Sequence, residues 1–356
     1  MTLPSLTIEG FRAFRRLEVP RLARVSLVVG SNNVGKTSLL EALELLAAGP
    51  AFPVVLGKIL RDRREFPTER GSTRDVDVLR IFHESTRQLQ IVGGTRRFAM
   101  SRAWAVPDDK GEHLLPNRVG RFKIAPEAAS APWDGVEVLD VRVNGAPPVP
   151  LTLDASLALP SGWIEQAEHA TLAATSIPAG GLEEEASARL WDSVVLEGEE
   201  ELLIDALRVI APDIGRVFFI NARGDSRIAY VRRTGQRNAE PLYSLGGGMR
   251  RLLDLALGLV EARGGILLVD EIENGIHYSV QPDLWALVFE AATRLDVQVL
   301  ATTHSWDCIE AFQRAAAAHP ATGELIRLHR SGADIHATIA DESDLAIITR
   351  EAIEVR

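Results

Sequence analysis

The sequence predicts an α/β fold with a mostly parallel sheet and helices on both faces of that sheet. From residue 198 onward, stretches with strand character alternate with stretches of helical periodicity, which is typical of a parallel sheet. Residues 265–270 contain a continuous apolar run, as expected for a strand that is buried on both faces, and residues 297–303 are predicted as another buried strand. Residues 24–29 are predicted as a further strand, which leads straight into a glycine-rich loop.

The N-terminal part of the chain contains two predicted strands, a loop and a helix. The strands are residues 6–8 and 24–29, and residues 38–46 form an amphipathic helix because apolar side chains recur every three or four positions. The pair Gly49-Pro50 ends this helix. The arginine-rich residues 52–74 that follow are predicted as loop.

The middle of the chain is predicted as a β-rich arm. Short alternating runs, such as residues 88–92 and 136–143, are separated by prolines and glycines. The arm is too short and too rich in proline for an extended coiled coil. We therefore expect a first part of the main lobe, the head, at 1–94, an inserted arm at 95–195 and a second part of the head at 196–356.

The last part of the chain alternates between the two kinds of element. Helices are predicted at residues 199–210, 249–262, 280–294 and 306–317, with a short helix at the end. Strands are predicted at residues 217–220, 227–231, 265–270, 297–303, 325–328 and 335–339.

The composition is that of an ordinary folded protein, with 46% hydrophobic and 25% charged residues among 356. This length fits one large lobe with an insertion, or two modest domains. The net charge of −10 argues against a general nucleic-acid coat, because phosphate neutralisation supplies most of that affinity, and leaves a local basic patch open. We expect a cytoplasmic protein without a membrane span: Cys308 is the lone cysteine, the N-terminus is no signal peptide, and no run approaches about 20 apolar residues.

One loop has the pattern G-x-x-x-x-G-K-T, between a strand and a helix. Backbone amides of such a loop, together with the positive end of the following helix, form a nest for anions. Lys36 is expected to reach the β- and γ-phosphates of ATP, and the hydroxyl of Thr37 to bind Mg²⁺. The predicted nucleotide-binding residues here are Gly30, Ser31, Asn32, Asn33, Val34, Gly35, Lys36, Thr37 and Ser38.

An acidic pair follows the apolar strand 265–270 at its carboxyl end, where ligands bind in open parallel sheets. Asp270 is expected to hold Mg²⁺ through water, and Glu271 to act as general base toward the attacking water. Exposed acids at strand ends are common, so this motif indicates a nucleotide site only in combination with the phosphate loop.

Two further segments are less specific when each is considered alone. Ser244, Gly246 and the glycines after them open a helix, and could equally form a plain N-cap. His304 follows the strand 297–303 and could donate to the γ-phosphate, although a lone loop histidine is usually structural.

The order and spacing of these four motifs resemble those of the ATP-binding-cassette ATPases. The opening Gly10-Phe11-Arg12-Ala13-Phe14, ahead of the phosphate loop, is similar to the RecF, SMC and OLD (overcoming lysogenisation defect) branch. Asp270-Glu271-Ile272-Glu273-Asn274-Gly275-Ile276-His277 resembles the OLD form of the acidic motif, and Ala301-Thr302-Thr303-His304-Ser305 resembles its histidine loop. The likeness covers residues 3–50 and 198–330 and is weak in the arm.

The resemblance implies a P-loop head of the ABC type, with an N-terminal antiparallel β portion and an inserted β-rich arm. It also implies a homodimer in which two heads enclose two nucleotides, so that Ser244 and Gly246 serve the γ-phosphate of the partner subunit. Lys36, Glu271 and His304 are then the catalytic residues, and Thr37 and Asp270 the metal ligands.

The sequence departs from the family pattern in three places. The signature lacks the glutamine of transporter ATPases, and the Q-loop glutamine cannot be assigned, with Gln88 and Gln90 as candidates. Many OLD proteins carry a Toprim nuclease domain after the ATPase, but only about fifty residues follow His304. We therefore expect no nuclease in this chain.

Two functions fit these observations. The first is an ATP-driven switch that controls a separately encoded effector, such as a nuclease, in defence against phage or foreign DNA. The second is a RecF-like, ATP-dependent DNA-binding protein of repair, favoured by the opening motif and by arginines that either face nucleic acid or are merely solvated. Those arginines are Arg12, Arg15, Arg16, Arg61, Arg63 and Arg64. A transporter subunit fits poorly, and a GTPase is disfavoured because no Asn-Lys-x-Asp motif occurs.

Overall fold

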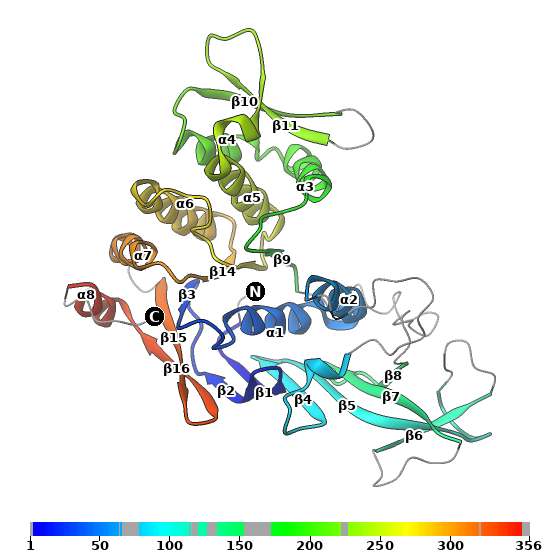
Figure 1. Ribbon diagram of the computed structural model, residues 1–356. Helices are drawn as coiled ribbons and strands as arrows, with labels where there is room; N and C mark the ends of the chain where they lie inside the picture. The colour runs from blue at the N-terminus through cyan, green and yellow to red at the C-terminus, as the bar shows by residue number, and fades with distance from the viewer. Residues whose placement is uncertain are drawn as a thin grey trace.

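A six-stranded sheet in the order β16-β15-β3-β14-β13-β9 forms the centre of the molecule (Figure 1). The computed structural model describes residues 3–63, 65, 78–113, 115, 120–126, 134–152, 172–221, 227–319 and 322–350. All neighbouring strands of this sheet run parallel except the edge pair β15 and β16. Its strands are β3 (Val25–Val29), β9 (Ala174–Ile177), β13 (Ile266–Val269), β14 (Gln298–Thr302), β15 (Gly323–Ser331) and β16 (Asp334–Ala340). The predicted, mostly parallel sheet is therefore present.

One face of this sheet is covered by helices from the second half of the chain (Figure 1). Alternate residues of β3 and β13, such as Leu27 and Leu267, belong to this hydrophobic core, because successive side chains of a strand point to opposite faces. Trp285 and Phe312 stack edge to face at its centre, with ring centroids 4.9 Å apart. The helices of this half are α3 (Glu184–Glu197), α4 (Glu200–Arg208), α5 (Gly247–Glu261), α6 (Gln281–Arg294), α7 (Trp306–Ala318) and α8 (Glu342–Arg350).

The opposite face of the sheet packs on α1 (Lys36–Ala48), and a second, antiparallel sheet covers α1 from the other side. Val28 of β3 and Leu268 of β13 contribute to this second core, together with the leucines of α1. The helix that begins at the phosphate loop is thus enclosed between two sheets, which fixes its direction.

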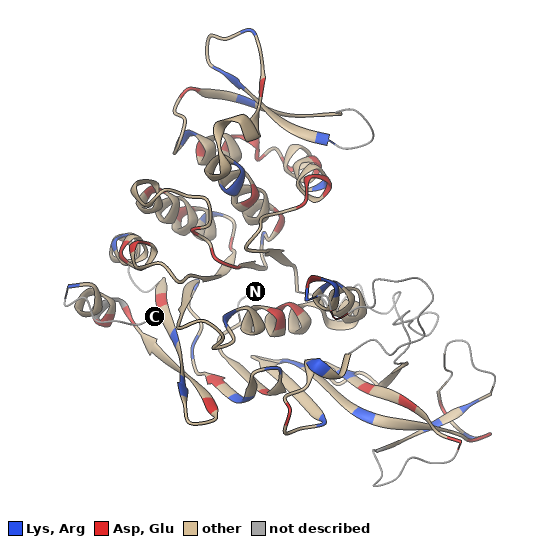
Figure 2. Cartoon of the chain, viewed as in Figure 1, with Lys and Arg blue, Asp and Glu red and all other residues tan. Residues whose placement is uncertain are grey.

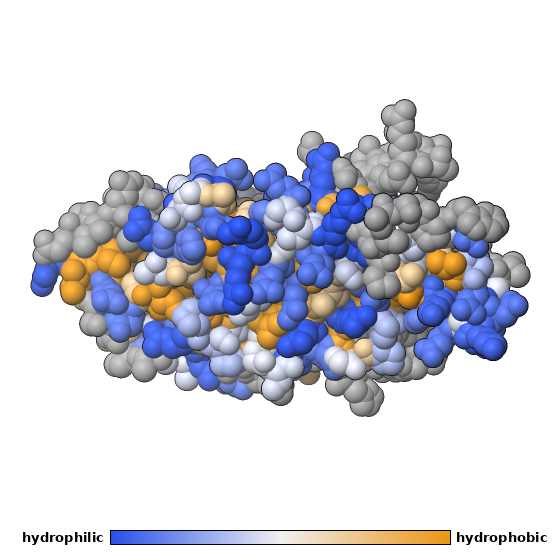
Figure 3. All heavy atoms as spheres, turned by 90° about the horizontal axis from the view of Figure 1, so that it is seen from below, coloured by the Kyte–Doolittle hydropathy of each residue, from blue (hydrophilic) through white to orange (hydrophobic). Residues whose placement is uncertain are grey.

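The antiparallel sheet has the strand order β2-β1-β4-β5-β7-β8, with β6 also paired to β5. Its outer face, seen from below in Figure 3, is predominantly hydrophilic with scattered apolar areas, as expected for a sheet that is buried on one side only. Its strands are β1 (Leu6–Phe11), β2 (Phe14–Val19), β4 (Gln88–Gly93), β5 (Arg96–Pro107), β6 (Phe122–Pro126), β7 (Val136–Val143) and β8 (Val149–Thr152). A separate three-stranded sheet contains β10 (Ile214–Asn221), β11 (Arg227–Arg233) and β12 (Glu240–Pro241).

Residues predicted as loop after the first helix form a second helix, α2 (Phe52–Asp62), so that prediction was wrong. Its buried residues include Phe52, Leu56, Ile59 and Leu60, which recur with helical spacing and pack in the second core. Pro53 lies in the first turn, where the missing N–H costs no hydrogen bond. The rest of the predicted loop, residue 64 and residues 66–74, lies outside the described residues.

The stretch Lys36–Asp62 is also long and apolar enough to cross a membrane, contrary to the expectation that no run approaches that length. Of its most apolar window, 78% is buried inside the fold. The apolar character is explained by two core helices, α1 and α2.

Two elements within the predicted arm, 95–195, belong to the head. Strand β9 pairs in parallel with β13 of the central sheet, and α3 packs in the first core. The strand was missed because its residues are only partly apolar and mostly not buried, so the sequence lacks a strand pattern there. Residues 153–171 lie outside the described part, and the domain boundaries themselves stay a prediction.

Candidate nucleotide site

The phosphate loop runs from the carboxyl end of β3 to the first residue of α1. Gly30 has φ 147° and Gly35 has φ 91°, so both adopt backbone conformations that favour glycine. A Cβ on Gly30 would lie 2.4 Å from the carbonyl oxygen of Leu328, and one on Gly35 would lie 2.7 Å from the ring of Phe14. The loop therefore fits only with glycine at these positions, and Phe14 links the opening motif to it.

The amino terminus of α1 has no side-chain cap in the described structure. Ser31, Asn32 and Asn33 are exposed, whereas Val34 is buried and anchors the loop in the second core. Because the first amides of a helix lack partners within the helix, they can donate to a bound anion. The loop has the geometry that the sequence predicts for a phosphate site.

Lys36 folds back over this loop. Its Nζ donates to the carbonyl oxygens of Gly30, at 2.7 Å, and Ser31, at 3.2 Å. Burial lowers the pKa of Lys36, while the carboxylates of Asp270, Glu271 and Glu273 act in the opposite direction. The ammonium group thus lies at the mouth of the loop and within the electrostatic reach of the acidic motif.

Asp270 lies directly beyond β13, between two threonines. Its Oδ2 accepts a hydrogen bond from Thr37 Oγ1 at 2.9 Å, and its Oδ1 accepts one from Thr302 Oγ1 at 2.6 Å. Segments 233 residues apart in the chain are thereby joined at one edge of the sheet. The predicted pair of metal residues, Thr37 and Asp270, is in direct contact.

This hydroxyl and this carboxylate fit Mg²⁺, which prefers hard oxygen ligands and keeps several waters when a substrate phosphate completes its shell. In the residues that the structure describes, no cluster of three or more His, Cys, Asp or Glu side chains is arranged to hold a metal. The hydroxyl of Thr37 and the carboxylate of Asp270 supply only two protein oxygens. They therefore suit a metal ion that is bound together with a triphosphate better than a metal ion that is held by the protein alone.

Glu271 adopts a left-handed backbone conformation, with φ 47°, which is uncommon for a residue other than glycine. Its N–H donates to Thr302 Oγ1 at 2.8 Å, and its Oε2 accepts a hydrogen bond from Asn274 Nδ2 at 2.8 Å. Asn274 also donates to the carbonyl oxygen of Ala179, at 3.1 Å. The carboxylate of Glu271 is held by these contacts and remains 36% exposed.

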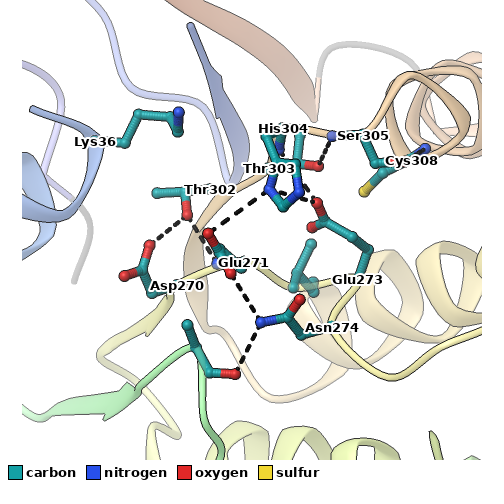
Figure 4. A network of polar contacts seen from close by, with 12 residues as sticks. Lys36, Asp270, Glu271, Glu273, Asn274, Thr302, Thr303, His304, Ser305 and Cys308 are labelled. Atoms are coloured by element: carbon teal, nitrogen blue, oxygen red, sulfur yellow. Dashed lines mark hydrogen bonds and ion pairs between the residues drawn. The ribbon is translucent and has the colours of Figure 1, made fainter. Parts of the chain in front are cut away.

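His304 follows β14 and lies over the acidic motif (Figure 4). Its N–H donates to Glu273 Oε1 at 3.2 Å. Its ring Nδ1 lies 3.4 Å from Glu273 Oε1 and 3.7 Å from Glu271 Oε1. The structure therefore brings Lys36, Thr37, Asp270, Glu271 and His304 to one edge of the central sheet.

The buried guanidinium of Arg251 supports the acidic motif from α5 and was not identified from the sequence. Its Nη2 donates to the carbonyl oxygens of Asp270, at 2.6 Å, and Glu271, at 3.0 Å, and its Nη1 donates to that of Pro178, at 2.8 Å. Burial lowers the pKa of Arg251, and the acidic side chains around it oppose that effect. Charged residues, Arg251 and Asp254, on the largely apolar buried face of this helix were the available signal.

Thr302 and Asn274 were likewise missed as individual site residues. Thr302 is fully buried, and an unpaired hydroxyl would be costly there. The signal in the sequence was a threonine within a strand predicted to be buried, since its hydroxyl needs a partner. Asn274 had no signal beyond its place in the acidic motif.

Ser244 and Gly246 lie in the turn before α5, at the end of η4 (Leu242–Leu245). Ser244 is exposed and its Oγ donates to the carbonyl oxygen of Pro241 at 2.6 Å, so it does not cap α5. A Cβ on Gly248 would lie 2.9 Å from the carbonyl oxygen of Gly275, so the first turn of α5 packs against the loop after the acidic motif. The role of Ser244 and Gly246 toward a nucleotide stays a prediction.

The glutamines proposed for the Q-loop are on β4. Gln88 lines two open hollows, of about 1010 Å³ and 660 Å³, on the antiparallel sheet, and Gln90 lines the smaller one. No residue of the phosphate loop lines either hollow. Neither glutamine is thereby assigned to the nucleotide.

Most of the arginines singled out in the sequence are paired with acids. Arg12 and Arg63 both bind Glu41, at 2.7 Å each, and burial of the Glu41 carboxyl raises its pKa, which these arginines oppose. Arg15 pairs with Asp334, and Arg16 pairs with Glu9 and Glu18. Figure 2 shows basic and acidic residues interspersed over the antiparallel sheet rather than gathered by sign. For Arg61 the described residues show no ion pair with an acid, and Arg64 lies outside the described residues.

Two family models match the sequence. Residues 1–78 match the AAA ATPase domain, and residues 150–307 match the family described as AAA domain, putative AbiEii toxin, Type IV TA system. Together they cover the phosphate loop, the signature segment, the acidic motif and His304.

Two curated relatives share shorter stretches. An uncharacterised protein of Methanocaldococcus jannaschii is 31% identical over 90 residues, which are 25% of this chain and 39% of that protein. The DNA replication and repair protein RecF of Thioalkalivibrio sulfidiphilus is 42% identical over 52 residues, which are 15% of this chain and 14% of RecF. The chain thus spans less than half the length of the curated relatives it matches.

Solved structures of similar fold are SMC heads. One is an Smc head domain with an extended coiled coil, bound to the C-terminal domain of ScpA derived from Pyrococcus furiosus, with TM-score 0.52, 11% identity and 99% of each chain covered. Another is the SmcHead bound to the C-winged helix domain of ScpA, with TM-score 0.50, 12% identity, and 96% of this chain and 98% of that chain covered. At such identities the likeness concerns the fold. Fold, motifs and family matches agree that this chain is an ABC-type P-loop ATPase of the RecF, SMC and OLD kind.

Proposed function

We propose that this protein is a switch ATPase that binds ATP with Mg²⁺, dimerises on ATP and controls a separately encoded effector. The observation that carries the proposal is the contact network at the edge of the central sheet. There Thr37 donates to Asp270, Thr302 joins Asp270 to Glu271, and the ring of His304 lies 3.7 Å from Glu271. A phosphate cradle and an acidic motif in direct contact are what hydrolysis of a triphosphate requires.

In the proposed reaction, amides of the loop and Lys36 bind the β- and γ-phosphates. Thr37 and Asp270 would hold Mg²⁺, which supplies charge neutralisation on those phosphates. Glu271 accepts a proton from water while the water oxygen attacks the γ-phosphorus, and the bond to the bridging oxygen breaks to leave ADP. His304 is placed beside Glu271 to donate to a γ-phosphate oxygen.

Dimerisation would complete the site. Ser244 and Gly246 are exposed, and no hydrogen bond within the described residues joins them to the phosphate loop of their own chain, which suits them for the nucleotide of a second copy. The γ-phosphate would then bridge two subunits, and its loss would release them.

A separate effector is favoured by the family comparison. The description of one matching family model names a putative toxin of a type IV toxin–antitoxin system, and such a system suits a role in defence. In that role the effector would be an enzyme such as a nuclease that acts on phage or foreign DNA.

Phosphate release by purified protein tests the ATPase, with the Lys36→Ala variant as comparison. We expect turnover by the native protein and loss of turnover in the variant, because the ammonium group that faces the phosphates is gone. Normal turnover in Lys36→Ala would refute the assignment of the loop. The existence of a separate effector is tested by purifying the protein from its native cells and identifying any bound protein that is released when ATP is depleted.

A RecF-like role in DNA repair is the second candidate, favoured by the 42% sequence identity to RecF over 52 residues. Its weakness is that Arg12, Arg15, Arg16 and Arg63 are paired with acids. DNA binding that weakens steeply with salt would favour this candidate, because the slope counts phosphate contacts.

A further inference from the structure

Glu273 is a buried carboxylate that the proposed reaction does not use. It follows the acidic pair, and its side chain is only 8% exposed. Its Oε2 is buried and has no hydrogen-bond partner within the described part of the chain. Burying a carboxylate is costly unless it is paired, so the partner of its other oxygen, Oε1, accounts for how this charge is held.

That partner is His304. Oε1 of Glu273 accepts the backbone N–H of His304 and also lies 3.4 Å from its ring Nδ1. A second carboxylate, that of Glu271, faces the same nitrogen at 3.7 Å (Figure 4). One side of the imidazole is thus turned toward two acids, and Nε2 is the nitrogen left for other partners.

A carboxylate beside one imidazole nitrogen favours a proton on that nitrogen and fixes the ring orientation. With Nδ1–H turned toward Glu273, the unprotonated nitrogen of a neutral ring is Nε2. The same contact through the backbone N–H holds the loop after β14 at a set distance from the acidic motif.

We propose that Glu273 is a positioning residue for His304: it holds the ring with its proton on Nδ1 and leaves Nε2 to serve the γ-phosphate. The part that concerns the γ-phosphate rests on the proposed function, whereas the state of the ring in the free protein does not.

Nitrogen NMR of protein labelled with ¹⁵N-histidine tests the proposal. The His304 signals are assigned by their absence in His304→Gln. We expect Nδ1 to carry the proton in the free native protein. In Glu273→Gln, which keeps an oxygen acceptor but loses the charge, the proton should move largely to Nε2, the site that free imidazole side chains prefer. The matched control is Glu310→Gln on α7, whose Oε1 accepts from Trp306 Nε1 at 2.7 Å and does not face His304.

Kinetics provide the second readout. Glu273→Gln should lower kcat by about tenfold or more, as outer partners of functional histidines do. KM should change by less than about twofold, because the phosphate loop is untouched, and Glu310→Gln should leave both parameters unchanged.

The outcomes separate the two proposals. A native His304 with its proton on Nε2 overturns the inference, whether or not any variant folds. Unchanged nitrogen spectra in Glu273→Gln, or changed spectra with an unchanged kcat, overturn it as well. A native protein that hydrolyses no ATP refutes the proposed function instead, while the spectra still decide where the proton on His304 lies.

Discussion

At the scale of single residues, Thr302 connects Asp270, the proposed metal ligand, to Glu271, the proposed general base. Its hydroxyl donates to Asp270 Oδ1 and accepts the N–H of Glu271, so one oxygen orients both acids. The left-handed backbone of Glu271 is held in place by this bond and by Arg251, which donates to the carbonyl oxygens of the two peptides that flank Glu271. Strain of this kind persists only where the surroundings determine it.

Thr302→Val should leave the packing of β14 intact while removing both hydrogen bonds. We expect the free energy of unfolding to fall by about 1–3 kcal/mol, because a buried N–H and a carboxylate oxygen lose their partner. We also expect kcat to fall on the order of tenfold, because Asp270 and Glu271 lose their orientation. Urea unfolding and phosphate release measure these effects. Thr293→Val, which removes a hydroxyl that donates within α6, controls for the substitution, and equal effects in both variants would contradict the role of Thr302.

Arg251→Met should destabilise the protein by at least about 2 kcal/mol, since several buried carbonyl oxygens lose their donor at once. The matched change is Arg314→Met on α7, whose guanidinium is largely exposed and pairs only with Glu310 among the described residues. Thermal unfolding of the two variants compares them. If Arg251→Met and Arg314→Met have nearly the same Tm, Arg251 does not support the acidic motif.

At the scale of elements, the phosphate loop is defined by what surrounds it. Gly30 lies against the carbonyl of Leu328 on β15, and Gly35 lies against Phe14 of β2, so both sheets shape the loop. The sequence predicted this loop, its helix and the acidic strand because each has a strong local pattern. It did not predict α2, because Pro53 and Gly57 obscured an apolar face that was present. It did not predict β9, because that strand is specified by pairing with β13 rather than by its own residues.

Gly30→Ala should weaken ATP binding by at least about tenfold, because its Cβ would collide with a backbone carbonyl that cannot rotate away, at a cost on the order of 1–3 kcal/mol. Gly235→Ala is the matched control, since Gly235 also has a positive φ, of 79°, but has open space around its Cβ. Isothermal titration with ATP and Mg²⁺ gives both affinities. Equal affinities would mean that the loop tolerates a shifted conformation.

At the scale of the whole molecule, two sheets enclose α1, and the candidate nucleotide site lies where the carboxyl ends of β3, β13 and β14 meet. The motifs alone predicted this convergence, because parallel strands end at a common edge. The contacts that stabilise it could not be predicted in the same way: Arg251 comes from a helix, Asn274 from a loop, and the pairing of Arg12 with Glu41 depends on tertiary structure.

The same architecture explains why the site is expected to respond to a second subunit. The exposed turn with Ser244 opens α5, and Arg251 of α5 binds the acidic motif. A nucleotide that contacts this turn from a partner subunit would act on an element that already supports Glu271.

The most direct test of the central claim is a comparison of Glu271→Gln with the native protein, each measured for ATP affinity, phosphate release and sedimentation with ATP and Mg²⁺. Glutamine keeps the shape and can keep the contact with Asn274, but it cannot accept a proton from water. We predict unchanged affinity, phosphate release slower by at least about 100-fold, and a dimer that persists with ATP. Phosphate release at the native rate, or a variant that stays monomeric with ATP bound, would contradict the account.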